Sequence, residues 1–357
     1  MEMGIDNIVL LIPSLSPDEK LVRYVRECVA LGFSNILVIN DGSSSEYDLI
    51  FDEIEEMAGV TVLKHPQNRG KGRALKTGFE YCAKIEPKIA GVVTADSDGQ
   101  HSPKDTMRVA KALLQEPDTL ILGSRNFQLE QVPFKSRFGN TLTTRVFALL
   151  FGRRIEDTQT GLRGIPAEWL LTLCEVPGER FEYEMKMLME IVREKLAIRE
   201  ITIETIYIEE NKETHFDPVW DSIKIYRVML ASFLRYTLSS GMASLVDISV
   251  FALLSKEILA ALPTEKNILA ATVLARIISS GFNYLCNRRL VFHSKGDVKK
   301  SALGYFMLVL LIMGASAGLV TLLNSLLPLD RVIIKIMVDT CLFLVSYKVQ
   351  QTVIFRK

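Results

Sequence analysis

Short apolar runs recur along the chain up to about residue 230, and most of them end in polar residues or glycine. Runs of this length indicate buried strands, and the stretches between them have the spacing of amphipathic helices. Strand and helix therefore alternate, which predicts an α/β fold with a mostly parallel, doubly wound sheet. The first helix is expected to begin with Ser16 as its N-cap and Pro17 in its first position. The expected strands cover residues 7–13, 34–43, 60–64, 90–94, 120–125 and 198–207.

Four much longer apolar segments follow, at about 233–254, 267–286, 303–327 and 332–355. Each is close to the roughly 20 residues that a helix needs to cross a bilayer. They predict an all-α domain with four transmembrane helices over residues 233–357, after a first domain over residues 1–215. Between the two, residues 216–232 place Trp220, Tyr226 and Arg227 at helical spacing, which suits an amphipathic helix in the headgroup layer.

The membrane part contains an internal repeat, because residues 283–292 match residues 346–355 in pattern. Two hairpins of two helices each are implied. Arg276 and Asp339 occupy equivalent positions of the repeat, so they could pair. Ionisable side chains inside spans usually face a partner or a polar cavity, and both helix assembly and binding of a lipid phosphate stay open as their role. The charged residues within or near the spans are Asp247, Arg276, Lys335, Asp339 and Lys348.

Charge along the chain bears on partners and location. The net charge of +0 gives no reason to expect a nucleic-acid partner. Lys and Arg cluster before the first long segment, between the second and third, and after the fourth. The positive-inside rule then places both termini and the first domain in the cytoplasm, in an integral protein of the plasma membrane. The five cysteines are scattered without metal-ligand spacing, so catalytic thiol chemistry is not expected.

Asp96 and Asp98 directly follow the apolar run 90–94. Two carboxylates two residues apart at the carboxyl end of a strand share one side of the extended backbone, and open α/β sheets bind their ligands at that edge. Carboxylate oxygens suit a hard divalent cation such as Mg²⁺ or Mn²⁺, which could neutralise a diphosphate leaving group. The alternative is an ordinary turn, because Asp, Ser and Gly all favour turns.

Polar residues also follow two neighbouring strands. Asp41 comes after the expected strand 34–43 and could accept hydrogen bonds from ribose or base hydroxyls. Arg69 and Lys71 lie in a glycine-spaced basic turn that leads into a helix, and they could face phosphates. A nucleotide could therefore lie across this edge of the sheet. A solvated helix start is the alternative for the basic turn.

Arginines follow the strand at 120–125. Arg125 ends that strand, and Arg137 and Thr141 lie on a helix expected to begin near Pro133. Two arginine forks can hold one phosphate dianion, because their geometry matches phosphate oxygens. The alternative is that Arg137 and Arg145 form a solvated face or bind lipid headgroups without specificity.

Five segments in this order resemble the family 2 glycosyltransferases of the GT-A fold. They read IPSLSPDE at 12–19, VINDGSSS at 38–45, NRGKGRALKTGF at 68–79, DSDGQHSP at 96–103 and LGSRNF at 122–127. Within that family the chain resembles the polyprenyl-phosphate sugar synthases, such as dolichyl-phosphate mannose synthase. The resemblance covers residues 5 to about 225. It implies a GT-A catalytic domain, and the membrane part resembles GtrA-like domains, which are linked with handling polyprenyl-phosphate sugars.

The resemblance implies a donor side and a metal. Pro13, Leu15 and Asp41 would hold the nucleotide together with Lys71, and Asp96, Asp98 and Gln100 would hold the metal and the diphosphate. The first motif departs from the family pattern, because Pro13-Ser14-Leu15-Ser16-Pro17 lacks the usual aromatic residue and acid. Asp18 or Glu19 is expected to take the place of that acid.

The resemblance also implies an acceptor side. Arg125, Arg137 and Thr141 correspond to positions that bind the acceptor phosphate. Residues 157–164 resemble an acceptor-side motif, in which Asp157 would lie near the sugar or its attacking phosphate and Arg163 near the acceptor phosphate. His215, in the polar segment 209–218, could touch a phosphate there, although a lone loop histidine is more often simply exposed.

Together these features predict an inverting, metal-dependent transfer of a hexose from a nucleotide sugar, of GDP-mannose or UDP-glucose type, to undecaprenyl or dolichyl phosphate at the cytoplasmic face of the membrane. The acceptor phosphate is already an anion, so no general base is required. Two alternatives stay open, in which the GtrA-like half transports the lipid-linked sugar or the chain is a non-catalytic scaffold. A processive polysaccharide synthase is disfavoured because no QxxRW motif occurs. The chain could also form a homo-oligomer.

Overall fold

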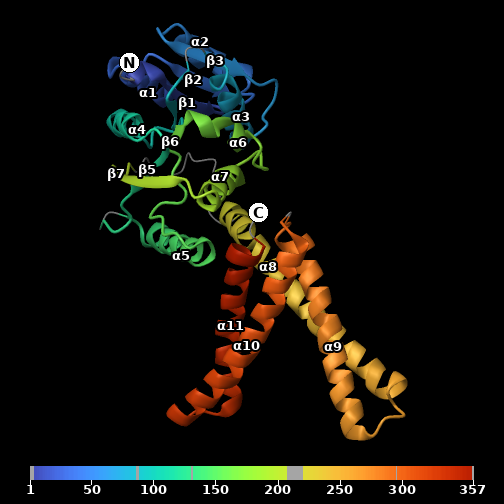
Figure 1. Ribbon diagram of the computed structural model, residues 1–357. Coiled ribbons are helices and arrows are strands. Elements are labelled where there is room, and N and C mark those ends of the chain that lie inside the picture. The colour runs from blue at the N-terminus through green and yellow to red at the C-terminus, as the bar shows by residue number, and fades with distance from the viewer. Residues whose placement is uncertain (1–3, 86–87, 130–131, 207–219, 295, 356–357) are drawn as a thin grey trace. The chain divides into compact units, whose positions relative to one another are not determined.

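The computed structural model describes residues 4–85, 88–129, 132–206, 220–294 and 296–355. Contacts between residues divide the chain into two compact units, 1–229 and 230–357, which are described separately. Figure 1 labels their helices and strands.

The first unit is built on a seven-stranded sheet with the order β3-β2-β1-β4-β6-β5-β7. All neighbouring strands are parallel except β6, which is antiparallel to both β4 and β5. The predicted α/β architecture with a mostly parallel sheet is confirmed. The strands are β1 (Ile8–Ser14), β2 (Ile36–Asn40), β3 (Val60–Lys64), β4 (Gly91–Thr94), β5 (Thr119–Arg125), β6 (Arg163–Pro166) and β7 (Ala197–Ile203).

Helices cover both faces of the sheet (Figure 1). Helices α1, α2 and α4 pack on one face, where β1 and β2 bury alternate apolar residues against them. Helix α3 packs on the other face against β1 and β2, and α6 and α7 pack against α3. The helices are α1 (Glu19–Ala30), α2 (Asp48–Glu55), α3 (Lys71–Cys82), α4 (Pro103–Gln115), α5 (Phe134–Phe151), α6 (Leu170–Cys174) and α7 (Glu182–Arg193).

Helix α1 begins later than the sequence pattern predicted. Asp18, rather than Ser16, is its N-cap, and Asp18 Oδ1 accepts the Lys20 backbone N–H at 2.8 Å. Ser16 has a positive φ of 50°, which is incompatible with a place in the first turn. The prediction of Ser16 as the cap is therefore wrong. The Asp18 side chain also offers an oxygen that can accept a backbone N–H, and it lies two residues closer to the helix.

Strand β6 is the one strand of this sheet that the hydrophobic pattern did not predict. It has four residues and lies between β4 and β5, with Arg163 opposite Thr94 and Leu122. A segment this short, with glycine and proline in it, shows no strand-like alternation. Its insertion places Arg163 in the interior of the sheet.

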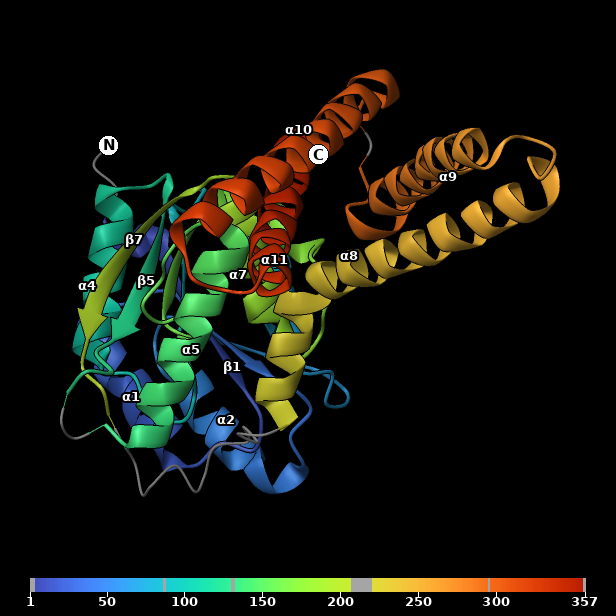
Figure 2. The ribbon, with the colours of Figure 1, turned by 90° about the horizontal axis from the view of Figure 1, so that it is seen from below.

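The second unit consists of two helical hairpins, and Figure 2 shows α8 and α9 running side by side. Short π-helical turns extend three of the helices, over Leu254–Ile258, Asn287–Val291 and Gln350–Ile354. Such turns are rare and occur mostly as single turns. The four helices are α8 (Trp220–Leu253), α9 (Thr264–Cys286), α10 (Val298–Leu326) and α11 (Arg331–Val349).

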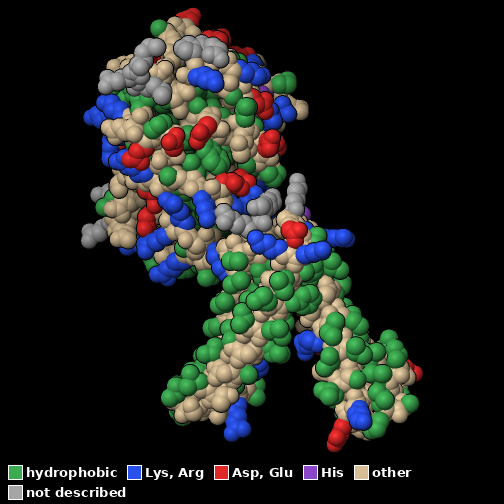
Figure 3. All heavy atoms as spheres, in the orientation of Figure 1, with side chains coloured by type: hydrophobic (Ala, Val, Ile, Leu, Met, Phe, Trp, Pro, Cys, Tyr) green, Lys and Arg blue, Asp and Glu red, His purple; other side chains and the backbone are tan. Residues whose placement is uncertain are grey.

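Three helices in the described part of the chain are long and apolar enough to cross a membrane, over Ile225–Ile258, Thr264–Val291 and Val298–Leu326. Their surfaces are covered with hydrophobic side chains (Figure 3). The fourth expected segment is helical as α11, but Lys335, Asp339 and Lys348 interrupt its apolar character. The structure thus supports a helical membrane region, while a fourth span stays a prediction.

Residues 220–253 form a single helix, α8, whereas the sequence pattern predicted a separate interfacial helix over 216–232. The boundary between the units falls inside this helix, after Met229. Segment 207–219 lies outside the described residues.

The internal repeat is visible in contacts between equivalent residues. Asn287 Nδ2 donates to Gln350 Oε1 at 3.0 Å, and both side chains are buried. The rings of Phe292 and Phe355 stack with their centroids 5.3 Å apart. Equivalent residues touch one another when two copies are related by a two-fold axis. The two hairpins therefore pack as a pseudo-symmetric pair.

The predicted pairing of Arg276 with Asp339 is wrong. Arg276 Nη2 lies 3.4 Å from Asp247 Oδ2, which links α9 to α8. Asp339 Oδ2 lies 2.9 Å from Lys335 Nζ, within α11. These charged side chains thus pair within one hairpin. Equivalent positions of two packed copies need not face one another.

Candidate active site

The aspartate pair lies in the loop that follows β4. Asp98 Oδ1 accepts the Gln100 backbone N–H at 2.9 Å, which fixes a tight turn. Asp96 Oδ2 lies 3.3 Å from His101 Nε2. Behind it, a Cβ on Gly161 would lie 2.2 Å from Asp96 Oδ2, so a side chain at this position would displace the carboxylate. The fold thus holds the Asp96 carboxylate between the turn and the chain that enters β6.

Lys71, the first residue of α3, joins the aspartate to α7. Its Nζ lies 2.6 Å from Asp96 Oδ1 and 2.7 Å from Glu184 Oε2. Burial alone would lower the pKa of Lys71, but these two carboxylates raise it above its ordinary value. Burial likewise opposes ionisation of Asp96, yet Lys71 and His101 hold the pKa of Asp96 well below its usual range. A fixed ammonium and a fixed carboxylate therefore adjoin at this edge of the sheet.

The donor set fits a divalent cation. Burial and the nearby charge of Asp96 raise the pKa of Asp98, because two close carboxylates repel each other. A cation between them would relieve that repulsion. Among the described residues there is no group of three or more His, Cys, Asp or Glu side chains placed around one point. Mg²⁺ is usually held by one or two carboxylates together with substrate phosphates, which this pair and the Gln100 amide could provide.

Asp41 holds the turn that leads to Lys71. Its side chain is buried, and its Oδ1 lies 2.7 Å from His65 Nδ1 and accepts the Arg69 backbone N–H at 3.0 Å. Its Oδ2 accepts the Gly70 N–H at 2.7 Å. Binding of ribose or base by Asp41 stays a prediction.

The other predicted donor residues lie at the end of β1. Pro13 is buried inside the strand, and Leu15 follows it half-buried. Asp18 is exposed, caps α1 and forms an ion pair with Lys20, with Asp18 Oδ2 at 3.0 Å from Lys20 Nζ. Its carboxylate thus stabilises the helix start, and the expectation that Asp18 replaces the missing acid of the donor motif stays a prediction.

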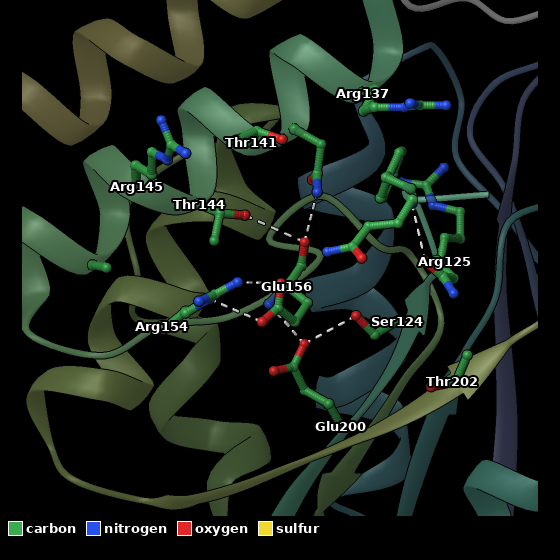
Figure 4. A pocket seen from close by; sticks show the side chains of 15 residues that line it. Ser124, Arg125, Arg137, Thr141, Thr144, Arg145, Arg154, Glu156, Glu200 and Thr202 are labelled. Atoms are coloured by element: carbon green, nitrogen blue, oxygen red, sulfur yellow. Dashed lines mark hydrogen bonds and ion pairs between the residues drawn. The ribbon is translucent and has the colours of Figure 1, made fainter. Parts of the chain in front are cut away.

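A second feature is a cavity of about 530 Å³ between β5 and α5 (Figure 4). Figure 4 shows Arg145 and Arg154 on one side of this cavity and Arg125 on the other. Thr141 and Thr144 add hydroxyl groups from α5. Arg154 is paired with Glu156, with Nε and Oε1 2.9 Å apart. We call this space the arginine cavity, because its four arginines are Arg125, Arg137, Arg145 and Arg154.

Asp157 fixes one of these arginines. Arg125 Nε lies 2.7 Å from Asp157 Oδ2 and Arg125 Nη2 lies 3.2 Å from Asp157 Oδ1, a two-point contact. Asp157 is fully buried. The carboxylate of Asp157 thus points at Arg125 and orients it, and a place of Asp157 near the sugar or the attacking phosphate stays a prediction.

Arg163 lies inside β6, where its side chain contacts the backbone. It is fully buried, and its guanidinium donates to the carbonyl oxygens of Thr160 at 2.8 Å and Glu184 at 2.9 Å. Binding of the acceptor phosphate by Arg163 stays a prediction. His215 lies outside the described residues.

Arg137 and Thr141 do line the arginine cavity. Arg137 Nη2 donates to the Leu129 carbonyl at 3.0 Å, and its Nε is buried without a hydrogen-bond partner among the described residues. A buried N–H without a partner is costly, so a bound anion would stabilise it.

The two features meet at Arg125. A smaller cavity of about 70 Å³ is lined by Gln100 and His101 from the aspartate loop and by Arg125 and Phe127 from the end of β5. The guanidinium of Arg125 therefore adjoins both the aspartate pair's loop and the arginine cavity. This arrangement can hold two anionic groups side by side.

Sequence reasoning missed four members of the site, namely Glu184, His101, Arg145 and Arg154. Glu184 gives no distinct signal in the sequence, because a glutamate in the first turn of a helix also suits the helix dipole. Arg145 lies one helical turn after Thr141, at the i+4 position. That spacing could have indicated that the two side chains lie on the same face of the helix.

Comparison with known proteins identifies both units. Residues 12–165 match glycosyl transferase family 2, and residues 235–355 match the GtrA/DPMS transmembrane domain. An uncharacterised protein of Methanocaldococcus jannaschii is 31% identical over 212 residues, covering 58% of this chain and 85% of that protein. A UDP-N-acetylglucosamine–dolichyl-phosphate N-acetylglucosaminyltransferase of Methanococcus voltae is 30% identical over 219 residues, covering 57% and 86%. A dolichyl-phosphate β-glucosyltransferase of Dictyostelium discoideum is 26% identical over 263 residues, covering 66% and 76%.

The mostly parallel sheet, with its aspartate loop after β4 and arginine cavity beside β5, defines an enzyme of the glycosyltransferase class with a GT-A-like fold. The chain belongs to glycosyl transferase family 2 and carries a GtrA/DPMS transmembrane domain. The resemblance drawn from the five sequence segments is confirmed, as is the prediction that the protein is an enzyme.

Proposed function

We propose that this enzyme transfers a sugar from a nucleotide sugar to the phosphate of a polyprenyl lipid, either dolichyl or undecaprenyl phosphate. The observation that carries the proposal is that Arg125 adjoins both the aspartate loop and the arginine cavity. Two anionic substrates are thereby accommodated next to each other. The relatives from Methanococcus voltae and Dictyostelium discoideum are named for action on dolichyl phosphate. The Methanococcus voltae enzyme is named for a UDP-sugar, which favours a UDP-linked hexose or N-acetylhexosamine as donor.

On the donor side, Asp96, Asp98 and Gln100 would hold Mg²⁺ or Mn²⁺. That ion would neutralise the negative charge that develops on the departing diphosphate. Lys71 already lies against Asp96, so its ammonium is available to the same diphosphate oxygens. Glu184 keeps Lys71 in place from the opposite side.

On the acceptor side, Arg125 and Arg137 would hold the lipid phosphate as a pair of forks, with Thr141 donating a hydroxyl hydrogen bond. One phosphate oxygen attacks the anomeric carbon, and the bond from that carbon to the nucleoside diphosphate breaks. The phosphate is already ionised at neutral pH, so no proton must be removed. A single in-line displacement inverts the configuration at the anomeric carbon, and holding the two groups in line supplies much of the rate.

The location of the enzyme is part of the proposal. The positive-inside pattern favours a cytoplasmic catalytic domain with cytoplasmic termini, in a membrane crossed by α8, α9, α10 and α11. The three apolar helices support a membrane domain, and α11 would be the fourth span. Within it Lys335 and Asp339 form an ion pair, and Asp339 also accepts the Ser316 hydroxyl.

The test is a transfer assay with the purified full chain in detergent. Undecaprenyl or dolichyl phosphate is supplied with Mn²⁺ or Mg²⁺ and a panel of radiolabelled UDP- and GDP-sugars. The label is expected to enter the organic phase with one donor, to stop with EDTA, and to stop in Asp98→Ala but not in the control Asp52→Ala, an exposed position on α2. Absence of transfer from every donor by folded protein would reject the proposal.

A second candidate function rests on the polar contacts between α8 and α9. Asp247 Oδ1 accepts the Ser279 hydroxyl at 2.8 Å and Asp247 Oδ2 lies near Arg276, within apolar spans. Ionisable groups at such positions often mark a substrate path. If the second unit moves the lipid-linked sugar across the membrane, Arg276→Gln would abolish translocation in vesicles while synthesis continues. Equal translocation by both proteins would exclude this candidate.

A further inference from the structure

Two buried polar atoms without partners line the cavity of about 70 Å³ between the aspartate loop and Arg125, which we call the small cavity. His101 Nδ1 and Thr205 Oγ1 are both buried and have no hydrogen-bond partner among the described residues. A buried polar atom that stays unsatisfied is costly, so each of them calls for a partner such as a ligand group or a water molecule. The small cavity is therefore suited to receive a polar group.

The contact between His101 and Asp96 defines what the cavity offers to that group. His101 Nε2 lies 3.3 Å from Asp96 Oδ2. An ionised carboxylate can only accept a hydrogen bond, so Nε2 carries the proton, and Nδ1 of the neutral imidazole is then an acceptor. The Thr205 hydroxyl can donate. The small cavity thus presents one acceptor and one donor.

The small cavity also has an apolar side and a limited size. Phe127, which follows β5, and Ile206 line it together with the polar residues. A molecule of liquid water takes up about 30 Å³, so roughly two water-sized groups fit into the cavity. A substituent of a few heavy atoms can therefore enter, whereas the six-membered ring of a sugar cannot.

The position of the cavity favours one substituent of the donor sugar. In the proposed reaction the anomeric carbon lies between the diphosphate at the aspartate loop and the acceptor phosphate at Arg125. Gln100 and His101 line the small cavity from the first side and Arg125 lines it from the second. The group on C2 is attached to the direct neighbour of the anomeric carbon, while the hydroxymethyl carbon is three bonds away. The C2 substituent is therefore the group best placed to enter.

We propose that the small cavity binds a 2-acetamido group, so that the donor is a nucleotide-linked N-acetylhexosamine and not a plain hexose. The amide N–H donates to His101 Nδ1, and the Thr205 hydroxyl donates to the amide carbonyl. The methyl group packs against Phe127 and Ile206. A 2-hydroxyl group is too short to fill the cavity and offers nothing to its apolar side. This inference rests on the proposed function and selects between the two donor classes that the proposed function leaves open.

The test measures donor binding by calorimetry, with the full chain in detergent, Mn²⁺ and no acceptor lipid. The ligands are UDP-N-acetylglucosamine, UDP-glucose and UDP, so that binding of the sugar is compared with binding of the nucleotide alone. Thr205→Val keeps the shape of the side chain and removes its hydroxyl, and Thr205→Leu fills the cavity. Thr172→Val, at an exposed position on α6, is the matched control.

We expect the parent protein to bind UDP-N-acetylglucosamine about 10-fold or more tightly than UDP-glucose, because a site that hydrogen-bonds a substituent discriminates against a ligand without it. Thr205→Val should weaken binding of UDP-N-acetylglucosamine about 5-fold and change binding of UDP-glucose by less than about twofold. Thr205→Leu should abolish the preference. Thr172→Val should bind both ligands as the parent does.

Equal affinity of the parent for the two nucleotide sugars overturns the inference. Weakening of both to the same extent in Thr205→Val also overturns it, because Thr205 would then only support the fold of the site. In both cases the proposed function stands if sugar is still transferred to polyprenyl phosphate. Selective binding of UDP-N-acetylglucosamine without transfer to any polyprenyl phosphate supports the donor class and rejects the proposed function. Binding of neither nucleotide sugar overturns both.

Discussion

At the residue scale, the proposed function depends most on the side chain of Arg125. It adjoins the aspartate loop on one side and the arginine cavity on the other, and the buried Asp157 fixes it through two contacts. A two-point pair of this kind sets both the position and the plane of the guanidinium. Asp157 is therefore a positioning residue for the acceptor phosphate.

Asp157→Asn keeps the shape of the side chain and removes its charge. We expect the KM for the polyprenyl phosphate to rise about 10-fold or more, since a hydrogen bond to a charged group is worth about 1.5–3 kcal/mol. The KM for the nucleotide sugar should change little. Steady-state kinetics with each substrate varied in turn measures both values, and Asp118→Asn, at an exposed position, is the control. An effect confined to the donor KM would contradict this role.

Sequence reasoning found the residue types of the site more reliably than their orientations. Asp41, Asp157 and Arg163 were all predicted as ligands, and all three are buried against backbone or another side chain. A strand end predicts where a residue lies, but the direction of its side chain depends on neighbours that are distant in sequence. The contact between Lys71 and Glu184 is of this kind, because no local pattern links α3 to α7.

At the element scale, the loop after β4 and the chain that enters β6 define the aspartate site together. Gly161 lies just before β6, and any side chain there would collide with the Asp96 carboxylate. Strand β6 went unpredicted because four residues carry no periodic signal, whereas β3 was predicted over its full length, Val60–Lys64. The part of the sheet that positions the proposed metal ligands was thus the part that the sequence pattern described least.

Gly161→Ala tests this dependence. The added methyl would lie 2.2 Å from Asp96 Oδ2, so the carboxylate must move. We expect transfer activity to fall at least about 10-fold and the Mn²⁺ concentration for half-maximal activity to rise, because a small misplacement of an active-site group is costly. Gly139→Ala, where a Cβ meets open space, is the control. Normal metal dependence in Gly161→Ala would show that Asp96 is not held from β6.

At the scale of the whole molecule, the chain joins a catalytic unit to a membrane unit that has its own internal symmetry. The division into an α/β part and a helical part was predictable because the lengths of the apolar runs change at about residue 230. The pairing of charges within each hairpin was not predictable, because the repeat shows which positions are equivalent but not which ones face each other. Asn287 and Gln350 do face each other, at the centre of the repeat.

Asn287→Leu should destabilise the second unit. It removes the donor to Gln350 and leaves a buried amide without its partner, at a cost of about 1–3 kcal/mol. The double variant Asn287→Leu/Gln350→Leu should recover part of that loss, because both polar groups are then removed. Thermal unfolding of the detergent-solubilised full chain measures both effects, with the exposed Ser325→Ala as control. A double variant less stable than the single one would contradict the pairing.

The most direct test of the central claim, that Arg125 holds the acceptor phosphate next to the donor site, compares the parent enzyme with Arg125→Gln in two assays. The first measures transfer of labelled sugar from the nucleotide donor to polyprenyl phosphate, and the second measures donor binding by calorimetry. We expect transfer by the parent enzyme, a loss of about 100-fold or more in Arg125→Gln, and donor binding within a few-fold of the parent. Undiminished transfer by a correctly folded Arg125→Gln enzyme would contradict this role of Arg125.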